Sequence, residues 1–220
     1  VPIYGFEQTG VRPLLASYQT LVERLSIDTV LLVDGGTDSL MRGDEAGLGT
    51  PEEDIASIAA VHPLDLPRKL LVCLGFGIDA FHEVCHAHFL EAVAELTRAG
   101  AFLGAWSLTA EMPEVRRYRE AALAVFDAMP HHPSIVTASI LSAIDGQFGD
   151  YHLTERTRGS ELFINPLMTL YWSFRLAPVA ERILYLDAVR QTETHGEVSE
   201  CIRRFHASLP AVRQWRDLPM

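Results

Sequence analysis

Two short apolar runs constrain the fold of this chain more than any other feature. Thr29–Val33 and Leu70–Leu74 lack polar alternation, and each leads directly into a loop rich in glycine and aspartate. A strand that is apolar on both faces belongs in a sheet covered on both sides, as in parallel α/β proteins. Helical periodicity before, between and after the runs adds the required alternation of strands and helices. The pattern predicts a three-layer, Rossmann-like α/β fold with a mostly parallel sheet.

The length and the order of the elements favour a single domain. A chain of 220 residues suits one α/β domain. Residues 1–150 hold the strand–helix core, and residues 151–220 are predicted to be mainly helical, with helices over Leu167–Phe174 and Pro178–Arg190 and a last one capped by Thr194. Because the sequence starts at Val1 with what resembles the end of a strand, we expect it to be a fragment of a longer chain.

The amino-acid composition indicates which binding partners and which cellular compartment to expect. The 29 Asp and Glu outnumber the 18 Lys and Arg, which disfavours nucleic acid as a partner. No apolar run approaches the roughly 20 residues of a membrane helix, so no membrane association is expected. Three widely spaced cysteines favour a reducing, cytoplasmic setting over a disulfide framework. A small-molecule ligand is the expected partner, and a homo-oligomer is compatible with these features.

The loop after the first run carries the main candidates for a ligand site. Asp34 and Asp38 stand four residues apart around Gly35 and Gly36. Ligands of open α/β sheets bind at the carboxyl ends of strands, and carboxylates suit a hard cation such as Mg²⁺ or Ca²⁺. We therefore expect Asp34 and Asp38 to be catalytic and metal-binding groups. Gly35, Gly36 and Arg42 are the expected ligand-binding residues. The alternative is a structural turn in which Arg42 pairs with a nearby carboxylate.

The loop after the second run, Gly75-Phe76-Gly77-Ile78-Asp79-Ala80, has the spacing G-x-G-x-x-A. Such a turn can hold an anion against a helix start, so Gly75 and Gly77 are expected to bind the ligand. A dinucleotide is disfavoured, because the acidic residue due about 20 residues later is missing. Asp79 either caps the next helix or joins the two acids of the first loop as a third carboxylate. The ends of parallel strands share one edge of the sheet, so we expect the two loops to lie together.

The segment His82-Glu83-Val84-Cys85-His86 matches the H-E-x-x-H pattern of zinc hydrolases. On a helix from Asp79 to about Ala99, His82 and His86 would face the same way, and Glu83 could activate water. The simpler explanation places the histidines beside the apolar stripe of a packed helix. That stripe is predicted to be buried at Phe81, Cys85, Phe89 and Leu96. His82 and His86 remain candidate acid–base groups, and a zinc hydrolase remains a further alternative. No structural zinc is expected, because the cysteines form no C-x-x-C pair.

A polar series in the second half of the chain could supply a nucleophile and its base, or arginine contacts to an anion. No G-x-S-x-G elbow accompanies it, so polar groups satisfied within the core or loops are the simpler explanation. The series consists of His131, His132, Ser139, Ser142, Asp145, His152, Thr154, Glu155, Arg156 and Arg158.

Three segments of the chain resemble a known family. The stretch VLLVDGGTDSLMRGDEAGLGTPEEDIASIAA (residues 30–60), the segment GFGID (75–79) and the segment NPLMTLYW (165–172) are similar to the domain of unknown function 1152. The resemblance implies a Rossmann-like α/β fold. It also implies that the family's glycine-rich N-terminal segment lies outside this sequence. It implies no reaction and no catalytic residue.

Two classes of function are compatible with these observations. In the first, an enzyme uses the carboxylates of Asp34, Asp38 and Asp79 to position a divalent cation such as Mg²⁺ and a small polar or phosphorylated substrate. His82 or His86 would then move the proton. In the second, the same site binds a nucleotide or another metabolite without chemistry, as in a sensor domain.

Overall fold

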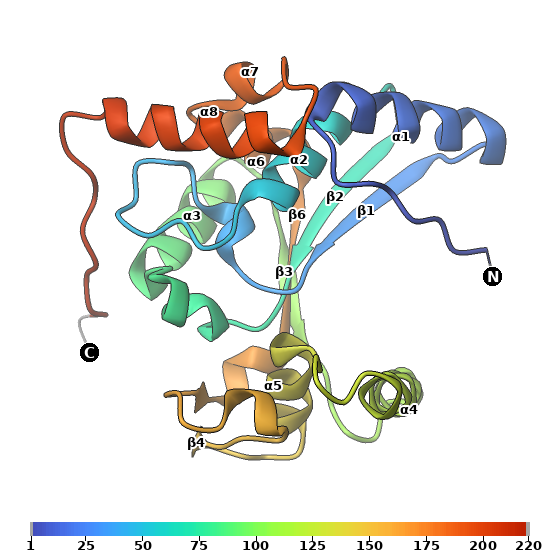
Figure 1. The fold of residues 1–220 in the computed structure, drawn as a ribbon, viewed down its shortest axis with the longest axis vertical. Coiled ribbons are helices and arrows are strands. Elements are labelled where there is room, and N and C mark those ends of the chain that lie inside the picture. The colour runs from blue at the N-terminus through green and yellow to red at the C-terminus, as the bar shows by residue number, and fades with distance from the viewer. Residues whose placement is uncertain (1, 219–220) are drawn as a thin grey trace.

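The computed structural model describes residues 2–218 and shows a mixed α/β fold (Figure 1). The strands are β1 (Thr29–Asp34), β2 (Arg68–Cys73), β3 (Phe102–Ser107), β4 (Gly149–Asp150), β5 (Phe163–Ile164) and β6 (Leu170–Arg175). The α-helices are α1 (Val11–Leu25), α2 (Glu52–Val61), α3 (His86–Arg98), α4 (Pro113–Ala128), α5 (Ile135–Ile144), α6 (Leu176–Arg182), α7 (Leu186–Val189) and α8 (His195–Ser208). The 3-10 helices are η1 (Asp38–Leu40), η2 (Ile78–His82), η3 (Glu155–Thr157) and η4 (Pro166–Thr169).

The main sheet is mixed, with the strand order β1-β2-β6-β3 in the described residues. β1 and β2 pair in parallel, with Val33 opposite Val72. β6 lies antiparallel to both of its neighbours. The predicted mostly parallel, Rossmann-like sheet is therefore not confirmed. The predicted helix over residues 167–174 is wrong, because β6 occupies most of it. Along β6, side chains alternate between the two faces of the sheet, with the half-buried Trp172 and the buried Phe174 on one face and Tyr171 and Ser173 on the other. Aromatic side chains occur on both faces, and they hide this two-residue period in the sequence.

The helices cover one face of this sheet. Figure 1 shows the sheet nearly edge-on, with α2, α3 and α6 on one side. On the opposite face of β1, Leu31 and Val33 are 51% and 57% exposed. The expected third layer is not found in the described residues. An apolar run indicates that both faces of a strand can be buried, but it does not show that helices pack on both faces.

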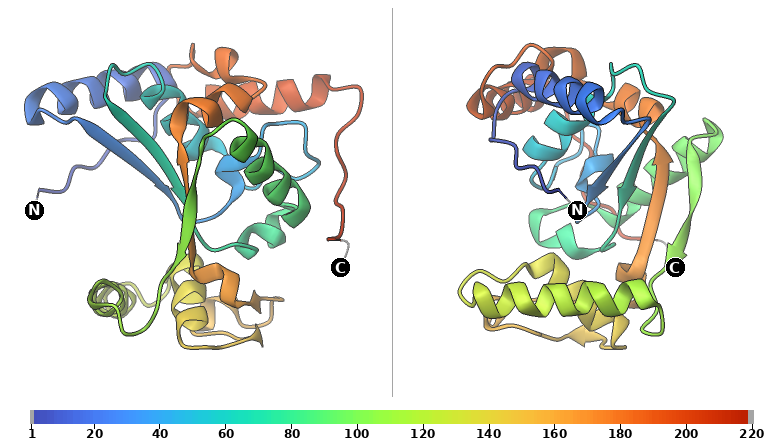
Figure 2. Two further views of the ribbon diagram at one scale, coloured as in Figure 1. Left: turned by 180° about the vertical axis from the view of Figure 1, so that it is seen from behind. Right: turned by 90° about the vertical axis from the view of Figure 1, so that its right-hand side faces the viewer.

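Residues 108–169 form a lobe inserted between β3 and β6 (Figure 2). The carboxyl ends of β1, β2 and β3 point toward this lobe, because these strands run in the same direction. A small apolar cluster joins the lobe to the loop after β2, since Ile78 packs with Ala143, Ile164 and Met168. The lobe thus lies where strand-end ligands bind.

The predicted helix from Asp79 to Ala99 is broken near its start. Residues 78–82 form η2, Glu83 has φ +64°, and α3 begins only at His86. Phe89 and Leu96 are buried as predicted, as is Cys85, whereas Phe81 is 74% exposed. Glu83 adopts the left-handed backbone conformation at the end of η2, which stops this helix before α3 begins.

The predicted helix over Pro178–Arg190 is interrupted at residues 183–185, between α6 and α7. Other helices follow their sequence signals more closely. α4 starts at Pro113, and α8 has a complete capping box between Thr194 and Glu197. None of the helices within residues 2–218 combines the length and apolar character needed to cross a membrane.

Candidate functional site

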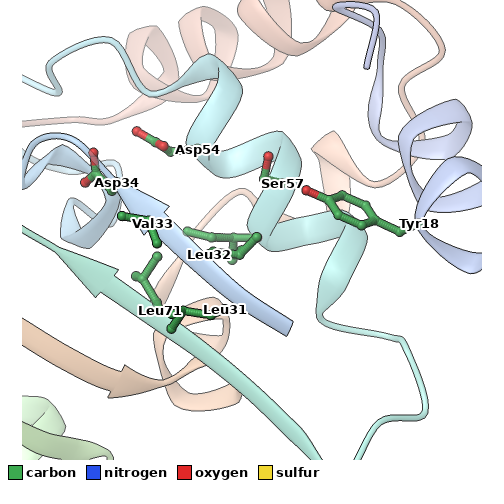
Figure 3. Close-up of a pocket in the computed structure, with 9 residues that line it drawn as sticks. Tyr18, Leu31, Leu32, Val33, Asp34, Asp54, Ser57 and Leu71 are labelled. Atoms are coloured by element: carbon green, nitrogen blue, oxygen red, sulfur yellow. The ribbon is translucent and has the colours of Figure 1, made fainter. Parts of the chain in front are cut away.

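Three carboxylates from separate segments meet at the carboxyl end of β1. Asp34 ends β1, Asp38 opens η1, and Asp54 lies in the first turn of α2. One carboxylate oxygen of each lies within 4.8 Å of those of the other two. Figure 3 shows Asp34 at the end of its strand and Asp54 on the helix that passes it. We call these three residues the carboxylate cluster. Asp34 and Asp38 are buried, and Asp54 is partly buried.

Loop amides hold two members of the carboxylate cluster in place. The Ser39 amide donates to Oδ2 of Asp34 at 3.3 Å. Oδ2 of Asp38 accepts from the Thr50 amide at 2.8 Å and from the Thr50 hydroxyl at 3.4 Å. Thr50 is therefore bonded to Asp38, and α2 begins after Pro51 without a side-chain cap. The Asp54 carboxylate is affected by burial and by neighbouring charges, with no hydrogen bond from the described residues.

Asp79 reaches the same place from the loop after β2. Its Oδ2 accepts from the Thr37 amide at 2.6 Å and from the Thr37 hydroxyl at 3.2 Å. The expected meeting of the 34–38 and 75–79 loops is thus confirmed. The role of Asp79 as a helix cap is wrong, because η2 follows Gly77 without any side-chain cap. Asp79 instead ties the two loops together.

Burial and mutual repulsion make these acids hard to ionise. Burial, followed by the charge of Asp38, raises the pKa of Asp34 to about 8 and that of Asp79 to about 6. Burial also raises the pKa of Asp38, and it raises the pKa of Asp54 with help from the charge of Asp34. Charged groups in such surroundings require a proton or a cation to balance them.

The carboxylate cluster borders a cavity of about 760 Å³ between the sheet and the inserted lobe. Gly35, Thr50, Asp79 and His82 line it on the sheet side. The lobe contributes polar groups and apolar side chains, namely Val125, Met129, His132, Ser134, Ile135, Val136, Arg156, Thr157, Ser160, Glu161 and Leu162. A partly apolar cavity with a few converging polar groups is the usual form of a small-molecule site.

Of the four glycines predicted to bind the ligand, Gly35 lines the cavity, whereas Gly36, Gly75 and Gly77 are not among its lining residues. A Cβ on Gly36 would come within 2.7 Å of Asp79 Oδ2. Gly75 and Gly77 have φ values of +84° and +91°, so both turns need a residue without a side chain. A Cβ on Gly77 would lie 3.1 Å from Nε2 of His86.

The structure separates the two histidines of the H-E-x-x-H pattern. His82 lines the cavity, whereas His86 packs between the rings of Phe76 and Trp215. Burial lowers the pKa of His86. Because η2 ends at His82 and α3 starts at His86, they share no helical face. The geometry behind the zinc-hydrolase alternative is therefore wrong, and His86 does not line the cavity.

Arg42 is also placed away from the cavity. Its guanidinium pairs with Asp44 at 2.9 Å and borders a smaller cavity of about 220 Å³ that Arg213 also lines. The expectation that Arg42 contacts the site's ligand is wrong. The alternative, that it pairs with a nearby carboxylate, is confirmed.

Sequence reasoning missed Asp54, because the sequence does not show which acid of α2 turns toward β1. Asp54 is the third acid in succession at the start of α2, and only this one turns toward the end of β1. In the polar series, His132 and Arg156 line the cavity. The hydroxyls of Ser139 and Ser142 instead donate to helix carbonyls, at 2.8 Å each.

Replacing Gly36 by Ala is expected to lower the free energy of unfolding by about 1–3 kcal/mol. The new Cβ would displace the Asp79 carboxylate from the Thr37 amide and separate the two loops. Gly196→Ala in α8 is the matched control, since nothing lies within 4 Å of its Cβ position. Urea unfolding measures both, and equal small changes would contradict the packing described.

The fold and the site define a mixed α/β protein with a buried carboxylate cluster at the ends of its strands, facing a cavity closed by an inserted lobe. The model of a family described as protein of unknown function (DUF1152) matches residues 4–207. The chain belongs to this family, which confirms the resemblance noted in its sequence. No curated protein and no solved structure matches the chain.

Proposed function

We propose that this protein is a divalent-cation-dependent enzyme acting on a small polar or phosphorylated molecule. One observation carries the proposal, which is the convergence of Asp34, Asp38 and Asp54 on one point beside the cavity. None of the main influences on the pKa values of these carboxylates is the charge of a Lys or Arg within residues 2–218. A cation is the natural partner for such a group.

The spacing of the carboxylate cluster suits a hard cation. Mg²⁺ and Ca²⁺ bind oxygen at about 2.0–2.6 Å, so the oxygens around one ion are about 3–5 Å apart. The three ligand oxygens lie within 4.8 Å of one another. Asp54 lacks a hydrogen-bond donor in the described residues, so it offers its oxygens freely.

The neighbouring residues suit proton transfer. A bound cation would attract an anionic substrate and lower the pKa of a bound water. Asp79, whose pKa burial raises to about 6, can exchange a proton near neutral pH. His82 lines the same cavity and is the second candidate for acid–base catalysis. The Gly35 backbone borders the space a substrate would occupy.

Titration of the protein with MnCl₂ by calorimetry at pH 8 tests the proposal. We expect one Mn²⁺ per chain, displaced by excess Mg²⁺, and a loss of affinity of about 100-fold or more in Asp38→Asn, since a charged ligand is removed. Asp65→Asn is the control, because Asp65 is an exposed loop residue. Failure of the unsubstituted protein to bind Mn²⁺ would overturn the proposal. Binding of cation and metabolites without turnover would favour the sensor alternative.

A further inference from the structure

The cavity beside the carboxylate cluster also has an apolar part. Three large apolar side chains that line the cavity remain exposed to solvent, namely Phe81 at 74%, Val125 at 52% and Met129 at 52%. They come from η2, from α4 and from the residue after α4. Exposed apolar side chains gathered in one concave place mark a binding surface.

Arg156 lines the same cavity and has no carboxylate partner in the described residues. Nη1 of Arg156 donates to the Pro133 carbonyl at 2.9 Å, which orients the guanidinium at the cavity. Arg156 forms no ion pair with the described residues, whereas Arg158 in the adjoining turn pairs with Glu155 at 3.0 Å. Glu161 lines the cavity as well and is exposed to solvent. An oriented guanidinium with free donors suits a phosphate or carboxylate.

The start of α5 is a weaker candidate for the anion. The Ser134 hydroxyl already accepts from the Thr137 amide at 3.2 Å, so one of its free amides is satisfied within the helix. The anion is therefore assigned to the side chain of Arg156.

We infer that the substrate of the proposed enzyme is an organic phosphate with an aromatic or similarly apolar part. The inference rests on the proposed function for the chemistry at the reactive end of this substrate. Arg156 binds the anionic group, and Phe81, Val125 and Met129 contact the apolar part. The cavity of about 760 Å³ lies within the range of small-molecule sites, about 300–1,000 Å³.

Calorimetric titration with phenylphosphonate tests the inference, because this probe has both parts and is not hydrolysed. Methylphosphonate lacks the ring, and benzyl alcohol lacks the anion. We expect phenylphosphonate to bind at least tenfold more tightly than either. Arg156→Gln should weaken its binding about tenfold or more, and the matched control Arg158→Gln less than twofold. Phe81→Ala should weaken phenylphosphonate but leave methylphosphonate unchanged.

Several results would overturn the inference. They are absence of phenylphosphonate binding, equal affinity in Arg156→Gln and the unsubstituted protein, or equal binding of benzyl alcohol. Arg156 and Phe81 are exposed, so these variants should fold, and melting temperatures check this. The MnCl₂ titration separates the two proposals. Mn²⁺ binding without phenylphosphonate binding leaves the proposed function standing and removes the inference. Phenylphosphonate binding without Mn²⁺ binding would support the anion site and overturn the proposal of a cation-dependent enzyme.

Discussion

Replacing Asp34 by Asn is expected to stabilise the metal-free protein at pH 8 while abolishing cation binding. Asp34 is buried next to two other carboxylates, and burial raises its pKa to about 8. Asparagine has nearly the same shape, can accept the Ser39 amide bond, and carries no charge. The gain in the free energy of unfolding at pH 8 should be on the order of 3 kcal/mol, since each pKa unit corresponds to about 1.4 kcal/mol and the neighbouring acids share the effect.

The stabilisation of the protein by Asp34→Asn should depend on pH. An acid whose pKa is raised on folding holds its proton more tightly in the folded state, so its stabilising contribution is complete below its unfolded pKa of about 4. That contribution is lost as the pH rises toward the folded value of about 8. The difference between the variant and the unsubstituted protein should therefore be small at pH 4 and grow up to pH 8. Urea unfolding at several pH values measures it.

Two further measurements complete the test. Mn²⁺ titration of Asp34→Asn should show no binding, although this variant is the more stable protein at pH 8. The exposed control Asp65→Asn should change neither property. If Asp34→Asn were less stable than the unsubstituted protein at pH 8, burial and repulsion by the neighbouring carboxylates would not destabilise the charged form of Asp34.

The parts of the site that sequence could predict lie close to the strands. β1 and β2 are apolar runs of the right length, and their loops meet because parallel neighbours end at one edge. The sequence alone therefore predicts that Asp34, Asp38 and Asp79 lie close together at one edge of the sheet. Asp54 could not be predicted in this way, because its direction depends on how α2 packs against β1.

The remaining errors have a common physical cause, which is that the deciding contacts are distant in sequence. β6 is a strand because β2 and β3 lie on either side of it, and its local pattern does not show this. The helix after Asp79 breaks at Glu83, which has a positive φ and packs against Gly47 in the loop after η1. Glu45 and Asp44, which also pairs with Arg42, both bind Arg213, which is more than 160 residues away.

Arg213 holds the C-terminal segment through several contacts. Arg213 joins three acids, with Nε on Asp44 at 2.8 Å, Nη1 on Glu91 at 2.8 Å and Nη2 on Glu45 at 2.5 Å. Glu45 is only 1% exposed. The backbone adds to the attachment, since the Arg213 amide donates to the Asp44 carbonyl and the Ala46 amide donates to the Arg213 carbonyl. The C-terminal segment is thus fastened to the loop that follows η1.

Arg213→Met is expected to lower the free energy of unfolding by about 3–5 kcal/mol, because it leaves the buried Glu45 charge without its cation. Methionine retains the packing of the arginine stem, so the loss reports the charge. Arg203→Met is the control, since the exposed Arg203 pairs with Glu200 at the surface and should cost about 0–1 kcal/mol. Adding Glu45→Gln to Arg213→Met should recover part of the loss, because the buried charge is then gone. Urea unfolding of the three variants measures these differences. If Arg213→Met lost no more stability than Arg203→Met, the backbone hydrogen bonds alone would hold the C-terminal segment, and the ion pairs would contribute little.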